Sequence, residues 1–159
     1  MKPQPIDPRE KIYRHIDAVF GSGISGRLPA EVEFEYSRRT GRIKNFSIEG
    51  QLAGTLRTDG GIALTIPGAQ YFSDNTVNFL ENCVIPLQEV VQFISEGRSL
   101  FCKHVEWCGS NVQAGSDVAV VDNGNVIAVG VAILPSRLMK RYNRGVAVKI
   151  REGIKGRTS

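Results

Sequence analysis

The first half of the chain opens with an apolar pattern that predicts a helix. Its hydrophobic residues recur at helical spacing, at Ile12, Ile16, Val19 and Phe20. Asp7 precedes this stripe and is expected to cap the helix, with Pro8 in the first helical position and Gly21 at the end. We therefore expect a helix over residues 8–20.

Alternating patterns then predict an antiparallel sheet of about four strands. Glutamates alternate with apolar residues over residues 31–36, as on an amphipathic strand. A second strand is expected over residues 43–48, and residues 51–57 and 62–66 are expected to form a hairpin joined by the turn Thr-Asp-Gly-Gly. A short helix is expected to open at residues 68–72.

The second half begins with a predicted helix and a predicted strand. We expect the helix over residues 86–96, started by its proline and ended by Gly97. The strand is expected over residues 100–106. Asn123-Gly124 then joins two further strands, because this dipeptide tolerates the positive φ angles of a tight hairpin.

The end of the chain combines apolar and basic positions. A short helix is expected to align four cations on one face, at Arg137, Lys140, Arg141 and Arg144. Leu138 and Tyr142 are expected on its other face. A strand over residues 146–151 is expected to have an apolar face and a second face that ends in Lys149 and Arg151.

Charge is distributed unevenly along the 159 residues, whose net charge is +4. Residues 1–84 hold ten basic and ten acidic side chains, whereas residues 85–159 hold ten basic and six acidic ones, so the whole excess lies in the second half. Residues 137–157 alone hold eight Lys or Arg against one acid. This distribution favours a polyanionic partner such as nucleic acid, and a solvated face that aids solubility is the alternative.

The composition is that of a folded protein, with 42% hydrophobic and 23% charged residues. No apolar run approaches the roughly 20 residues that span a bilayer. The N-terminal sequence lacks the apolar core of a signal peptide. Three cysteines, an odd number, favour free thiols in a reducing compartment, so we expect a cytoplasmic protein.

Each candidate chemical site in the sequence has an ordinary structural explanation that we favour. Cys102, His104 and Cys108 lie close in sequence, and the first two are expected on one strand face, but the trio lacks the paired spacing of zinc ligands. The glycine-rich residues 21–26 follow a helix, whereas phosphate loops connect a strand to a helix. We therefore expect no catalytic residue, no metal and no cofactor.

The second half resembles a PUA domain, the small β-barrel found on pseudouridine synthases and archaeosine transglycosylases. The most specific stretch is Asn-Arg-Gly-Val-Ala-Val-Lys-Ile-Arg at residues 143–151. Other resembling positions are Phe93, Gly97, Arg98 and residues 100–103, 114–118, 120–121 and 128–130. The resemblance implies a C-terminal β pseudo-barrel.

The first half resembles the domain that directly precedes the PUA domain in archaeal tRNA-guanine transglycosylases. The resembling stretches are residues 36–45, 52–66 and 68–72. In those enzymes the catalytic part resembles a TIM barrel, which needs about 250 residues. We expect this chain to have no room for such a barrel.

The expected fold class is α+β. An N-terminal helix-plus-antiparallel-sheet domain is expected over residues 1–78, and a PUA-type pseudo-barrel over residues 79–159. The boundary is expected within residues 73–82, where the sequence is polar with a few large apolar residues.

By position, the PUA resemblance implies RNA contacts near the exit of the first helix, the second helix and the last strand. These residues are Gly97, Arg98, Lys103, Arg137, Lys140, Arg141, Arg144, Lys149 and Arg151. Arg38, Arg39 and Arg42 cluster at a turn and would extend the contact surface; pairing with the glutamate-rich strand beside them is the alternative.

The resemblance implies a non-catalytic protein that binds tRNA or another structured RNA. It would act in tRNA modification of the archaeosine type, beside a separately encoded transglycosylase-like catalytic chain. Two alternatives stay open: a ribosome- or translation-associated RNA-binding adaptor, and a protein-interaction scaffold without specific RNA.

Overall fold

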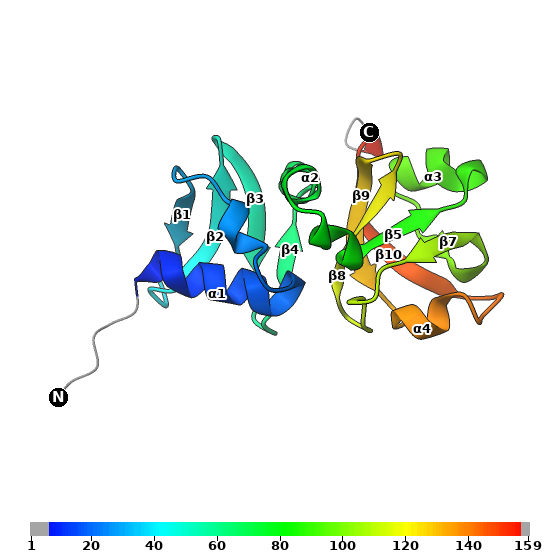
Figure 1. Ribbon diagram of the computed structural model, residues 1–159, viewed down its shortest axis with the longest axis horizontal. Coiled ribbons are helices and arrows are strands. Elements are labelled where there is room, and N and C mark those ends of the chain that lie inside the picture. The colour runs from blue at the N-terminus through cyan, green and yellow to red at the C-terminus, as the bar shows by residue number, and fades with distance from the viewer. Residues whose placement is uncertain (1–6, 157–159) are drawn as a thin grey trace.

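Two β-sheets lie side by side along the long axis of the protein, each with its own helices (Figure 1). The computed structural model describes residues 7–156. Arg157, which counted toward the basic stretch, lies outside these residues. The α+β class expected from the sequence is confirmed.

The first helix, α1 (Pro8–Phe20), forms where the sequence predicts it. The Asp7 carboxylate accepts a hydrogen bond from the Arg9 amide at 3.0 Å and so satisfies one of the free donors at the helix start. Gly21, with a φ of 125°, ends the helix. The buried stripe is Ile12, Ile16 and Phe20, with Val19 half-buried beside it.

The N-terminal sheet is fully antiparallel, in the order β1-β2-β3-β4. Its strands are β1 (Glu33–Tyr36), β2 (Ile43–Ile48), β3 (Gln51–Leu56) and β4 (Ile62–Leu64). The 3₁₀ turn η1 (Ser25–Arg27) connects α1 to this sheet. The four predicted strands are thus present; β1 begins two residues later than predicted, and β3 and β4 end one and two residues earlier.

Helix α2 (Ile66–Asn75) follows β4 and lies between the two sheets (Figure 1). Thr65 caps it, accepting a hydrogen bond from the Gly68 amide at 3.0 Å. Gly68 lies so close to β3 that a Cβ atom there would be 2.1 Å from the Ala53 carbonyl oxygen. The short helix expected at residues 68–72 is therefore present and longer than predicted.

The C-terminal sheet curls into a nearly closed barrel with the strand order β6-β10-β9-β8-β5-β7. Its strands are β5 (Cys83–Pro86), β6 (Leu100–Phe101), β7 (Val105–Cys108), β8 (Asp117–Asp122), β9 (Asn125–Ala132) and β10 (Val146–Gly153). The remaining helical segments are η2 (Asn78–Asn82), η3 (Gln88–Val90), α3 (Val91–Ser95), η4 (Cys102–His104) and α4 (Ser136–Met139).

The β8–β9 hairpin is confirmed at its turn. Asn123 has a φ of 48° and Gly124 a φ of 80°, the left-handed pair that a two-residue hairpin requires.

The helix predicted over residues 86–96 is wrong at its start. Pro86 ends β5, and helical structure begins only with η3 and continues in α3. β5 pairs on both sides, with β7 and β8, and Cys83 and Val84 are completely buried. These long-range pairings outweigh the local preference of proline for a first helical turn.

The strand predicted over residues 100–106 is interrupted. β6 and β7 lie at opposite edges of the sheet, so the chain crosses between them through η4. Cys102 and His104 lie in this turn and do not share a strand face.

The helix predicted near residues 137–144 is only one turn long, α4. Tyr142 is 49% exposed and does not pack beneath the helix. The helix ends at Met139. Gly145, with a φ of 91°, then turns the chain into β10, and its carbonyl oxygen accepts a hydrogen bond from the Cys102 amide at 3.0 Å.

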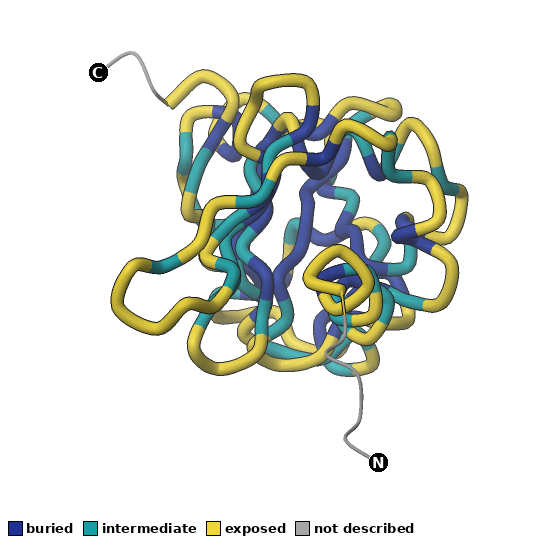
Figure 2. The backbone as a smooth tube through the Cα atoms, turned by 90° about the vertical axis from the view of Figure 1, so that its left-hand side faces the viewer, coloured by how far each residue is buried: buried dark blue, intermediate teal, exposed yellow. Residues whose placement is uncertain are grey.

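One hydrophobic core runs across the boundary between the sheets. Residues from β5, β8 and β9 join the core of α1, α2 and the N-terminal sheet, namely Cys83, Ala119, Val121, Val126 and Val129. A second core fills the barrel itself. Figure 2 looks along the long axis and shows this buried backbone in the middle, with exposed turns around it.

Candidate nucleic-acid interface

A shallow hollow lies where the exit of α3 meets the end of β10. It has a volume of about 310 Å³ and is lined by Glu96, Gly97, Arg151, Glu152, Gly153 and Gly156. Gly97 has a φ of 99° and no atom within 4 Å of where a Cβ would stand. The backbone is therefore open to a large ligand at this position.

The opposite wall of this hollow is packed backbone to backbone. A Cβ atom on Gly153 would lie 2.4 Å from the Ser95 carbonyl oxygen and 2.5 Å from the Gly97 nitrogen. The Lys155 amide donates a hydrogen bond to the same Ser95 oxygen at 2.7 Å. This close packing fixes the distance between the α3 exit and the last strand.

Arg98 stands beside the hollow on an aromatic support. Its guanidinium lies 5.4 Å from the centre of the Phe93 ring, the geometry of a cation–π contact. Both side chains are exposed, so the charge stays accessible to solvent.

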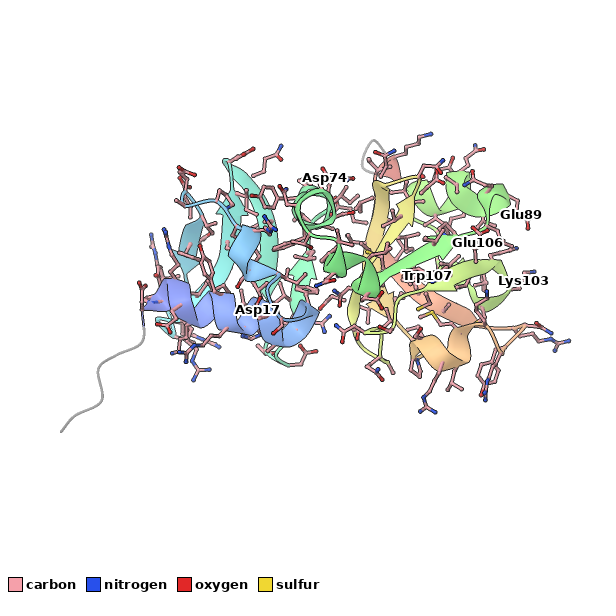
Figure 3. All side chains as sticks on the ribbon, in the orientation of Figure 1. Asp17, Asp74, Glu89, Lys103, Glu106 and Trp107 are labelled. Carbon is pink, nitrogen blue, oxygen red and sulfur yellow. The ribbon has the colours of Figure 1, made fainter. Side chains whose placement is uncertain are left out.

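Six other cations implied by the sequence are exposed at one end of the molecule. They are Lys103, Arg137, Lys140, Arg141, Arg144 and Lys149. They come from η4, α4, the loop after α4, and β10, and Figure 3 shows Lys103 at the far end of the barrel. Among the described residues, none of the six forms an ion pair with a carboxylate; Lys140 instead donates to the Glu106 carbonyl oxygen at 2.7 Å.

Arg151 is placed differently, at the junction of the two sheets. It donates a hydrogen bond to the Leu64 carbonyl oxygen of β4 at 2.6 Å, and its Nη1 lies 3.6 Å from Asp117 Oδ1. Its side chain is 37% exposed, so it still reaches solvent while it bridges the sheets.

Sequence reasoning singled out neither Arg57 nor Asp117 as a functional residue. Arg57 Nη1 donates to Asp117 Oδ1 at 3.1 Å, and Arg57 Nε donates to Asp59 at 3.1 Å. The Asp117 side chain is 3% exposed, and its Oδ2 has no hydrogen-bond partner among the described residues. Burial raises the pKa of the Asp117 carboxyl, and the neighbouring guanidinium groups of Arg57 and Arg151 oppose that effect.

Arg38, Arg39 and Arg42 lie in the exposed turn between β1 and β2, at the opposite end of the long axis from α4 and β7 (Figure 1). Among the described residues, these arginines form no ion pair with the glutamates of β1. Glu35 instead accepts a hydrogen bond from the Asn45 amide at 3.1 Å. The structure therefore separates this turn from the basic end of the barrel.

The three cysteines are free thiols that are buried or half-buried. Burial raises the pKa of Cys83 to about 12, which makes this thiol unreactive. Within residues 7–156, no three His, Cys, Asp or Glu residues are grouped so as to hold a metal ion. In the same part of the chain, the helices are too short or too polar to cross a membrane.

Comparison with known families assigns both halves. Residues 84–154 match the PUA domain, and residues 10–77 match the patch-forming domain C2 of tRNA-guanine transglycosylase. The chain thus carries these two domains in sequence. It is homologous to the C-terminal part of archaeal tRNA-guanine(15) transglycosylases.

Curated relatives are much longer than the aligned region. The tRNA-guanine(15) transglycosylase of Thermoplasma acidophilum is 35% identical over 147 residues, covering 90% of this chain and 23% of that protein. The enzyme of the same name from Methanothermobacter thermautotrophicus is 30% identical over 151 residues, covering 93% of this chain and 23% of that protein. The chain therefore spans about a quarter of the length of these relatives.

Solved structures share the whole fold. A hypothetical protein from Pyrococcus horikoshii aligns with a TM-score of 0.72 at 20% identity, covering 94% of this chain and 93% of that one. A PUA domain protein from Aeropyrum pernix aligns with a TM-score of 0.66 at 16% identity, covering 96% and 85%. The two-sheet arrangement thus occurs in proteins from two archaea.

Proposed function

We propose that this chain binds structured RNA, specifically tRNA, through one surface of its PUA domain. This basic surface consists of Gly97, Arg98, Lys103, Arg137, Lys140, Arg141, Arg144, Lys149 and Arg151. The observation that carries the proposal is the group of six exposed cations on the barrel half of the molecule, none of which has a carboxylate partner among residues 7–156.

The chemistry of the basic surface suits a double-stranded RNA backbone. Arginine binds phosphate through two parallel hydrogen bonds, lysine acts as a point charge, and Gly97 lets the backbone approach. Double-stranded RNA is recognised mainly by shape and 2′-hydroxyl groups, so we expect little base specificity from these contacts.

The proposed role is that of a non-catalytic subunit or accessory factor in tRNA modification. The homology to the C-terminal part of tRNA-guanine(15) transglycosylases supports a part in tRNA binding for this chain. In this proposal the chain holds the tRNA while a separately encoded catalytic chain modifies the base. Arg38, Arg39 and Arg42 would contact only an RNA long enough to reach the far end of the protein.

The first test is a tRNA filter-binding titration at several salt concentrations with duplex DNA as competitor. Binding that prefers tRNA and weakens steeply with salt is expected, because phosphate contacts release counterions. Equal binding to DNA, or none to RNA, would overturn the proposal in favour of a scaffold. Co-purification with ribosomal subunits would favour a translation adaptor.

A variant pair tests the surface itself. Arg141→Glu with Lys149→Glu should lower tRNA affinity at least about tenfold and reduce the salt slope by about two, one for each lost phosphate contact. Lys11→Glu with Lys44→Glu makes the same charge change on exposed positions of α1 and β2, and should cost less. Unchanged affinity in a folded Arg141/Lys149 variant would sink the assigned surface.

A further inference from the structure

Three charged side chains interlock the two sheets. Arg57, which follows β3, reaches into the barrel and donates to Asp117 Oδ1 at 3.1 Å and to the Gly115 carbonyl oxygen at 3.3 Å. Arg151 of β10 reaches the other way and donates to the Leu64 carbonyl oxygen of β4 at 2.6 Å. Each domain thus sends one guanidinium to the backbone of the other.

Asp117 is the common partner of both arginines. The same oxygen, Oδ1, lies 3.1 Å from Arg57 Nη1 and 3.6 Å from Arg151 Nη1. At 3% exposure, the carboxylate cannot follow a moving guanidinium into solvent. Arg151 is therefore held beside a fixed carboxylate, whereas the cations of α4 and its following loop have no carboxylate partner among the described residues.

The anchored arginine belongs to the proposed RNA surface. Arg151 lines the hollow beside Gly97, and its side chain remains 37% exposed. A guanidinium that is already oriented loses less conformational freedom when it binds a phosphate. The carboxylate also reduces the local positive charge, so orientation and charge have opposite effects on phosphate binding.

We propose that Asp117 is a positioning residue for RNA binding, which holds Arg151 ready at the hollow while Arg57 of the N-terminal domain balances the buried carboxylate. This inference rests on the proposed RNA-binding function. It gives the N-terminal domain a part in RNA binding without direct contact, through Arg57 and the Leu64 carbonyl.

The test uses the opposite effects that the charge of Asp117 and the orientation of Arg151 have on RNA binding. Asp117→Asn removes a negative charge, which alone would strengthen RNA binding, whereas positioning predicts roughly tenfold weaker tRNA binding and a salt slope smaller by about one. Glu106→Gln removes one negative charge from an exposed carboxylate of β7 and should bind tRNA no more weakly than the parent protein. Equal or tighter binding by Asp117→Asn would overturn the inference.

A double-mutant cycle separates positioning from a general effect on the fold. Asp117→Asn should weaken binding no further in an Arg151→Met background, because the proposed positioning acts through Arg151 and only the favourable loss of negative charge remains. A further loss in that background would overturn positioning. If the parent protein bound no tRNA, the proposed function would fail and this inference with it, an outcome distinct from failure of the variants alone.

A measurement without RNA or substitutions covers the case in which Asp117→Asn does not fold. In the nuclear magnetic resonance spectrum of the parent protein, the Arg151 guanidinium should show separate Nη signals that exchange slowly. Its Nη2 donates a hydrogen bond to the Leu64 carbonyl oxygen, and its Nη1 forms an ion pair with Asp117. A single averaged Nη signal would mean free rotation and would overturn the inference.

Discussion

Single backbone contacts decide how closely the elements of this protein pack, and Gly68 is the clearest case. A side chain there would meet the Ala53 carbonyl of the neighbouring strand at 2.1 Å, and neither backbone has room to move. No pattern in the sequence marks this glycine as different from those in turns, because the contact comes from tertiary packing.

Gly68→Ala should therefore lower the free energy of unfolding by about 1–3 kcal/mol, the usual cost of overpacking. Gly26→Ala is the matched control, since Gly26 has no atom within 4 Å of a Cβ position and no left-handed φ; it should change stability by less than about 0.5 kcal/mol. Urea unfolding monitored by circular dichroism measures both. Equal stability of the two variants would contradict the packing seen here.

The buried carboxylate of Asp117 predicts a pH dependence of stability. Its pKa is raised above the ordinary value of 3.8, so the folded state binds this proton more tightly than the unfolded chain does. Ionisation of Asp117 is therefore less favourable in the folded state than in the unfolded chain. The stability that the protonated carboxyl contributes is lost as pH rises from about 3.8 through the raised pKa.

The measurement is the free energy of unfolding of the parent protein minus that of Asp117→Asn, followed from pH 3 upwards. This difference should fall as pH rises and then level off, because carboxylates that do not interact with Asp117, such as Glu81, titrate alike in both proteins and cancel. A difference that rises with pH would show that the two arginines outweigh burial.

At the scale of helices and strands, the local sequence pattern was sufficient to predict an element that is amphipathic and capped. The α1 helix, the four N-terminal strands and the Asn123-Gly124 hairpin all follow from periodicity and turn chemistry. β5 and the break at η4 do not, since both depend on which strands meet across the barrel. The helix α4 was predicted too long because the four cations fit a helical spacing, whereas the helix ends at Met139.

Helix α2 shows how an element can hold the two domains together. The Gln70 amide donates to the Gly124 carbonyl oxygen at 3.0 Å and accepts from the Val126 amide at 2.7 Å. One side chain therefore takes the place of a strand partner at the tip of the β8–β9 hairpin.

Gln70→Ala should destabilise the protein by about 1–3 kcal/mol, because the Val126 amide would lose its hydrogen-bond acceptor in a part-buried position. Hydrogen exchange of the Val126 amide should accelerate more than that of the neighbouring barrel amides. Gln92→Ala, on an exposed position of α3, serves as the control and should change neither quantity. Unaltered Val126 exchange in Gln70→Ala would refute the bridging role.

For the whole molecule, the exposure of the late cations was predictable from the sequence, whereas the contacts of Arg151 were not. Exposed cations late in the chain could be read from charge and spacing. The capture of Arg151 by Asp117 and Leu64 could not, since these partners lie 34 and 87 residues away in sequence and meet only through the docking of the sheets. The separation of Arg38, Arg39 and Arg42 from the other cations likewise required the three-dimensional arrangement.

The shared core predicts that the barrel depends on its neighbour. A truncated chain of residues 79–159 would expose the apolar side chains that β5, β8 and β9 contribute to the N-terminal core. It should bind a hydrophobic dye and melt at a lower temperature than the intact protein, which should unfold in one calorimetric transition. Two well-separated transitions in the intact protein would contradict this dependence.

The core that crosses between the two sheets also limits how this protein could be re-used in engineering. A graft of the barrel alone onto an enzyme would leave an exposed apolar surface in the fusion protein. The smallest unit that can be transferred to another protein is therefore the pair of domains. A fusion should be joined through the exposed start of α1 and not through the junction at η2.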